Sequence, residues 1–101
     1  MVSCDFILLN DQQWHILPQN AVNIVFESRG STADIYTSHD GTNPGGLSDI
    51  EHLIGTLTPQ GPGNKDHLAI DKVAGFCLQK VRADITGGTG DIRVYFNRIK
   101  L

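Results

Sequence analysis

Apolar and polar residues alternate in several short segments of the chain. In the clearest case, residues 91–101, alternate positions carry Ile92, Val94 and Phe96. This period of two is typical of a β-strand with one buried face. A second apolar stretch, residues 75–85, precedes it, and the glycine-rich segment 86–90 separates the two. We therefore expect residues 75–101 to form a β-hairpin with a glycine turn.

Two further strands are predicted near the middle of the chain. Residues 20–27 would place Val22, Ile24 and Phe26 on the buried face, and residues 32–38 would bury Ala33 and Ile35. The intervening turn Ser-Arg-Gly-Ser at 28–31 predicts a second hairpin with a four-residue loop. Shorter extended segments are expected at residues 6–9, 12–17, 55–58 and 68–70. Residues 47–54 suit one helical turn or a strand, and an irregular segment with at most one short helix is favoured there.

Seven to eight short strands with turns every eight to twelve residues predict an all-β fold. The expected architecture is an antiparallel β-sandwich, jelly-roll or Ig-like, in a single domain over residues 1–101, with at most one short helix. In the strand before the glycine turn, the apolar positions change parity near Gln79 and Lys80. This change predicts a β-bulge there, or a strand buried on both sides.

Composition narrows the functional classes. Apolar content of 40% argues against disorder, and a net charge of −3 gives no general attraction to nucleic acid or anionic membranes. Two cysteines, Cys4 and Cys77, are too few for a disulfide scaffold and leave open one bond or two free thiols. The start of the chain has no basic leader, and no apolar run is long enough to cross a bilayer, so synthesis in a cytoplasm is expected.

No catalytic, metal or cofactor site is predicted. Ser38, His39 and Asp40 are consecutive, so their side chains cannot hydrogen-bond in series as a hydrolytic triad requires. The four histidines show no close pair of metal-ligand spacing. Oxygen-bearing side chains around Asp40 miss the EF-hand spacing and leave calcium as a weak hypothesis. The glycines at 87–90 precede Asp91 and a strand, so they are predicted to serve a turn and not a phosphate.

Three candidate surfaces remain. Trp14, Tyr36 and Tyr95 could form an aromatic platform for a sugar, although Trp14 beside Ile16 favours the core. Loop residues expected to make contacts are Asp40, Asn43, Pro44, Gln60 and Asn64. A basic face is expected from Arg82, Arg93 and Arg98, the alternative being an ordinary solvated strand face.

Three segments carry a resemblance to a known class of proteins. IYTSHDGTN (residues 35–43), GTLTP (55–59) and VRADITGGTGDIRVYF (81–96) are similar to segments in small β-sandwich structural proteins of tailed bacteriophages. The resemblance implies a non-enzymatic virion protein, assembled in the host cytoplasm and binding the major capsid or other virion proteins. The expected role is capsid decoration as a homo-oligomer, with a trimer favoured. The alternative is a tail-associated or carbohydrate- and cell-surface-binding adhesion module.

Overall fold

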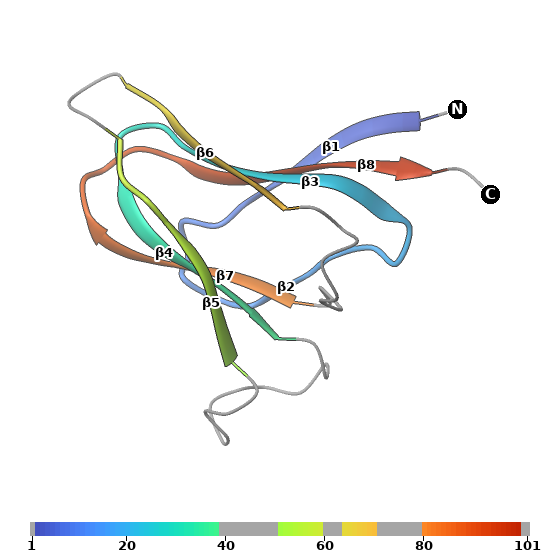
Figure 1. Ribbon diagram of the computed structural model, residues 1–101, viewed down its shortest axis with the longest axis horizontal. Coiled ribbons are helices and arrows are strands. Elements are labelled where there is room, and N and C mark those ends of the chain that lie inside the picture. Colours follow the sequence, from blue (N-terminus) through green and yellow to red (C-terminus); the bar gives the residue numbers. More distant parts are fainter. Residues whose placement is uncertain (1, 39–50, 60–63, 71–79, 100–101) are drawn as a thin grey trace.

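The computed structural model describes residues 2–38, 51–59, 64–70 and 80–99, and these residues form eight β-strands and no helix (Figure 1). The all-β prediction is thereby confirmed. Residues 51–54, expected to lie in an irregular segment with at most one short helix, belong to a strand instead. The strands are β1 (Val2–Leu8), β2 (His15–Ile16), β3 (Ala21–Ser28), β4 (Thr32–Ser38), β5 (Glu51–Leu57), β6 (Asp66–Ile70), β7 (Lys80–Gly87) and β8 (Ile92–Ile99).

The strands form two four-stranded antiparallel sheets that pack face to face. Sheet A has the order β1-β8-β3-β6, and sheet B has the order β2-β7-β4-β5. Strands pair from the outside of the sequence inward: β1 with β8, β2 with β7, β3 with β6, and β4 with β5. A long hairpin rolled into two layers gives this order, which is that of a jelly roll. The Ig-like option is wrong, because its first two strands share a sheet, whereas β1 and β2 lie in different sheets.

Both predicted hairpins are wrong, although all four of their strands exist. β3 lies in sheet A and β4 in sheet B, and β7 and β8 are separated in the same way. Each connecting turn therefore crosses from one layer to the other, as Figure 1 shows. Alternation indicates which side chains share a face, but it does not identify the neighbouring strand. Here β8 pairs with β1 and β3, whose residues are far away in the sequence.

The two crossing turns pack against each other. The backbone N–H of Arg29 donates to the carbonyl of Asp91 at 2.9 Å, and the Ser31 hydroxyl donates to the carbonyl of Gly90 at 2.7 Å. A Cβ atom built on Gly90 would lie 1.8 Å from the carbonyl oxygen of Arg29. Gly88 has φ +85°, a left-handed conformation that favours glycine. These glycines belong to a turn, as predicted. Glycine is required at position 90 because a Cβ atom there would keep the two backbones from approaching this closely.

Asn10 ties a third crossing, between β1 and β2, to the same end of the sandwich. Its side-chain amide donates to the Gly90 carbonyl at 3.1 Å, and its side-chain oxygen accepts the Ile92 N–H at 2.8 Å. One side chain thus fixes the start of β8 relative to the end of β1. This end of the fold is held by hydrogen bonds between segments about 80 residues apart.

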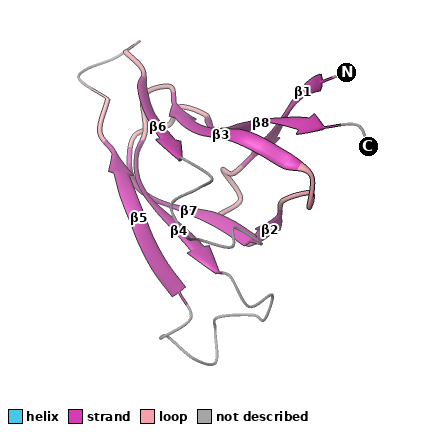
Figure 2. Cartoon of the chain, turned by 45° about the vertical axis from the view of Figure 1, so that its right-hand side comes forward, coloured by secondary structure: helices cyan, strands magenta, loops and turns pink. Residues whose placement is uncertain are grey.

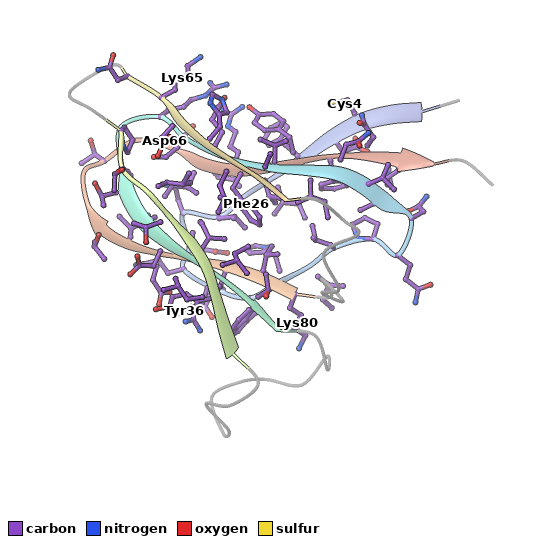
Figure 3. The ribbon with its side chains drawn as sticks, in the orientation of Figure 1. Cys4, Phe26, Tyr36, Lys65, Asp66 and Lys80 are labelled. Carbon is purple, nitrogen blue, oxygen red and sulfur yellow. The ribbon has the colours of Figure 1, made fainter. Side chains whose placement is uncertain are left out.

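The hydrophobic core lies between the sheets. Among the described residues, Phe26 is the largest fully buried side chain, and Figure 3 shows it between the two layers. The inward positions predicted from alternation in β4 and β8 are confirmed. The buried apolar residues are Leu9, Leu17, Ile24, Phe26, Ala33, Ile35, Leu57, Val81, Ala83, Ile92, Val94 and Phe96.

Irregularities in register concentrate on three ladders. β3 shifts against β8 between Val22 and Val25, β4 shifts against β5 after Ile35, and β4 shifts against β7 after Thr32. The bulge predicted near Gln79 and Lys80 falls partly outside the described residues. At the opposite rim from β1 and β2, the edge strands β5 and β6 lie close together (Figure 2), and Gly55 packs against the Leu68 side chain.

Candidate interaction surfaces

Most residues of the predicted contact loops lie outside the described part of the chain. Asp40, Asn43, Pro44 and Gln60 lie outside the described residues. Asn64 is exposed and immediately precedes the segment that leads into β6. The role of these loops in contacts stays a prediction.

The three arginines expected to form a basic face do not share one. Arg82 lies on β7 in sheet B, whereas Arg93 and Arg98 lie on β8 in sheet A. Within β8 the two arginines differ in parity, so that Arg93 is on the outer face and Arg98 is on the side of Phe96. Each arginine also has a carboxylate partner, namely Asp84, Asp91 and Asp5 respectively.

The most developed surface is a row of large side chains across the outer face of sheet B. Arg82 stands opposite Tyr36, and Tyr36 stands opposite Leu53. Trp14 directly precedes β2 and reaches Arg82 from the other side. We call Trp14, Arg82, Tyr36 and Leu53 the arginine–aromatic row. Figure 3 shows Tyr36 on the outside of sheet B, away from Phe26.

The Arg82 guanidinium is the centre of the row. Its Cζ lies 4.6 Å from the centroid of the Trp14 ring and 4.8 Å from that of Tyr36, within the range of cation–π attraction. Its Nε and Nη2 donate to the two carboxylate oxygens of Asp84 at 2.7 and 3.0 Å. Only 17% of the Arg82 side chain is exposed. The guanidinium is therefore held in one orientation, and it is not the freely solvated group that the alternation favoured.

The row has a polar and an apolar border. On one side, Asp84 stands opposite Asp34, and Asp34 accepts a hydrogen bond from the Thr56 hydroxyl at 2.8 Å. On the other side, Ile16 on β2 is 72% exposed. Leu53 at the end of the row is 57% exposed. Two large apolar side chains are thus exposed to solvent close to the Arg82 guanidinium, which is held in one orientation.

The expectation that Trp14 and Ile16 point into the core is wrong. Trp14 is half-buried on the outer face, Ile16 is exposed, and Leu17 is the buried residue of this segment. β2 is a two-residue edge strand, so its apolar parity does not have to match the core. The three-residue aromatic platform is also divided, since Tyr95 lies in sheet A. Nothing in the sequence could have joined Trp14 to Arg82, because their contact depends on the pairing of β2 with β7.

The outer face of sheet A carries a second cluster of large side chains. Tyr95 lies between Phe6 on β1 and Val25 on β3. The Phe6 and Tyr95 rings are 5.7 Å apart, and the Arg93 guanidinium lies 4.6 Å from the Phe6 centroid. Phe6 is 51% exposed and Leu8, also on β1, is 45% exposed. This face is therefore apolar at its β1 rim.

Toward β6 the same face becomes charged around Glu27, which is only 7% exposed. Its carboxylate accepts a hydrogen bond from Arg29 Nε at 2.5 Å and is hydrogen-bonded to His67 Nε2 at 3.0 Å. Burial would raise the pKa of Glu27, but the hydrogen bonds from Arg29 and His67 outweigh it, so this pKa lies below its usual value of 4.5. Arg93 Nε is buried without a hydrogen-bond partner among the described residues. The cluster is an internally compensated network and offers no uncompensated charge to a ligand.

The described part of the chain contains no group of three metal-binding side chains, and none of it forms a helix long and apolar enough to cross a membrane. Cys4 is a free, exposed thiol on β1. Comparison of the chain with protein-family models, curated proteins and solved structures finds no match.

Proposed function

We propose that this chain is a non-enzymatic virion structural protein that decorates a capsid lattice and binds it through the arginine–aromatic row. The observation that carries the proposal is the composition of that row. Trp, Tyr and Arg are the residue types that dominate binding energy at protein–protein interfaces. Here all three are adjacent on one sheet face, with an exposed leucine beside them.

Preorganisation supports a binding role for the row. Arg82 is held by two rings and a bidentate carboxylate, so a partner would not have to immobilise a flexible side chain. Ordering a rotamer-rich side chain at an interface costs about 0.5–1.5 kcal/mol, and this cost is already met in the free protein. Trp14 and Tyr36 keep part of their surface in water.

The size of the row suits a multivalent partner. It spans four strands, and strands in a sheet are about 4.8 Å apart, so the row is about 15 Å long. A patch of this length gives a weak single contact. Many copies on a repeating lattice would add through avidity. Many viral capsid proteins have a jelly-roll fold. This supports the proposal only by analogy of fold, because a shared fold does not imply a shared binding site.

The test is occupancy of the particle. We expect the chain to sediment with virions in a density gradient and to be visible by electron microscopy at a repeated lattice position. Arg82→Ala should lower its occupancy at least tenfold, while Lys65→Ala, an exposed cation leading into sheet A, should leave it unchanged. Thermal melting of both variants checks that they are folded. A chain found only outside particles, or equal occupancy for both variants, would contradict the proposal.

A carbohydrate-binding adhesion module is the second candidate. It is favoured by one observation, that Trp14 lies on the outer face near Tyr36 and not in the core. Against it, the Arg82 guanidinium lies over both rings and takes up ring surface on which a sugar would stack. A saturable change in Trp14 fluorescence on titration with host-surface glycans, abolished by Tyr36→Ala, would favour this candidate. No change with any glycan would favour the protein partner.

A further inference from the structure

β1 differs from the other edge strands of the described residues. β2 has two residues, β5 is interrupted by a register shift, and β6 has five residues beginning Asp-His. Short, bulged or charged edges resist pairing with another chain. β1 has seven residues, follows β8 without a register shift and contains no proline and one charge, Asp5. It lies at the rim of sheet A in Figure 1.

The hydrogen-bond pattern shows which backbone groups of β1 face outward. The N–H of Leu9 donates to the carbonyl of Ile92, the residue opposite it, at 2.8 Å. Bonded and non-bonded pairs alternate in an antiparallel ladder. Ile7 and Asp5 therefore bond to β8, whereas Leu8, Phe6 and Cys4 direct their N–H and C=O groups to the open side. The same three side chains are exposed on the outer face.

We propose that two copies of the chain associate through β1, in an antiparallel pairing centred on Phe6. The result would be one eight-stranded sheet made from two copies of sheet A. Centred on Phe6, the pairing sets Phe6 against its copy and Leu8 against Cys4 of the second copy, which covers both exposed apolar side chains. The charged Asp5 then faces an apolar Ile7. This proposal rests on a different surface from the arginine–aromatic row and does not depend on it.

A second copy is the occupant because the strand is complementary to itself in this register. Every outward N–H and C=O of one copy meets its counterpart in the other, as two-fold symmetry requires. Centring on Asp5 would instead place two carboxylates opposite each other, and like charges directly opposite are unfavourable. Centring on Cys4 would leave Leu8 outside the central pairs. The apolar residues and the single charge thus favour the Phe6-centred register over these two alternatives.

The first test is mass in solution. We expect light scattering to give twice the chain mass of 11.0 kDa, and Phe6→Lys to raise the dissociation constant at least 100-fold. Ile16→Lys is the matched control, because Ile16 is an exposed apolar residue on an edge strand of sheet B, and it should leave the dimer intact. A monomer at all concentrations, a trimer, or a dimer that survives Phe6→Lys would overturn the proposal. A monomer would point to a strand from another protein as the partner.

The second test fixes the register and works even if affinity is modest. Directly opposed, hydrogen-bonded residues have Cα atoms about 5.5 Å apart, which suits a disulfide. In a Cys77→Ser background, Leu8→Cys should form an intermolecular disulfide with the native Cys4 on mild oxidation. Adding Cys4→Ser should abolish it. A cross-link that persists without Cys4, or one that forms between native Cys4 residues and not with the introduced thiol, would refute the Phe6-centred register.

Discussion

Replacing Gly90 by alanine tests whether the sandwich depends on the close packing of its two crossing turns. The added Cβ would lie 1.8 Å from the Arg29 carbonyl oxygen and 2.4 Å from its carbonyl carbon, and these are backbone atoms that cannot rotate away. Gly90 does not have a positive φ, so the cost is steric and not conformational. Alanine therefore requires the two turns to separate.

The magnitude follows from what this separation breaks. Real Cβ contacts essentially never fall below 3.0 Å, so the gap must open by more than 1 Å. The two turns are joined by hydrogen bonds of 2.7 and 2.9 Å, which such an opening would stretch past useful length. At a net contribution of about 1 kcal/mol each, the loss is about 2 kcal/mol. For a domain of this size that lowers Tm by roughly 8–16 °C.

Urea denaturation at pH 7, followed by Trp14 fluorescence and circular dichroism, measures this loss. Gly87→Ala is the matched control, because no atom lies within 4 Å of its added Cβ and its φ is not positive. It should change the free energy of unfolding by no more than about 0.5 kcal/mol. If the two variants have equal stability, the crossing turns do not constrain the fold as argued.

Three further outcomes are expected. Phe26→Ala should lower the free energy of unfolding by about 3–5 kcal/mol in urea denaturation, because Phe26 is fully buried between the sheets; a loss below 1 kcal/mol would contradict that position. Since the pKa of Glu27 is lowered in the folded protein, its contribution to stability is present above pH 4.5 and lost as pH falls through the folded value. Glu27→Gln should therefore flatten the acid side of a curve of unfolding free energy against pH, and an unchanged curve would contradict this. A residual slope should remain from Asp11, whose pKa is lowered chiefly by a hydrogen bond from His15. Arg82→Lys should lose the bidentate contact with Asp84 and most of the stacking on Trp14. We expect a shifted Trp14 emission and a free energy of unfolding lower by about 1 kcal/mol. Identical emission spectra and melting curves would count against the stacked arrangement.

Cys4 shows that the presence of a cysteine in the sequence does not reveal whether it forms a disulfide. Two cysteines in the sequence left a bond open, and the structure shows Cys4 as an exposed free thiol on an edge strand. An exposed thiol is a convenient probe of β1 and not evidence of chemistry. Its value here is that a native cysteine sits where the proposed pairing can be trapped.

The fold class and the inward faces of β4 and β8 could be predicted from the sequence alone. Ile92, Val94 and Phe96 are buried, and so are Ala33 and Ile35, because side chains alternate along any extended strand irrespective of its neighbours. Turn residues also predicted the start of β4 correctly, and the end of β3 and the start of β8 to within one residue, but β7 continues two residues into the predicted glycine turn. These properties are local, and local residues are sufficient to encode them.

Only the tertiary structure decided which strands pair and which surfaces result. A short glycine-containing turn can close a hairpin or cross between layers, and the choice depends on contacts such as Asn10 with Gly90, 80 residues apart. The same pairing brings Trp14, Arg82 and Tyr36 together and leaves β1 at a rim. Both candidate surfaces are therefore products of strand order. Strand order is set by the packing of the whole chain, which no single segment specifies.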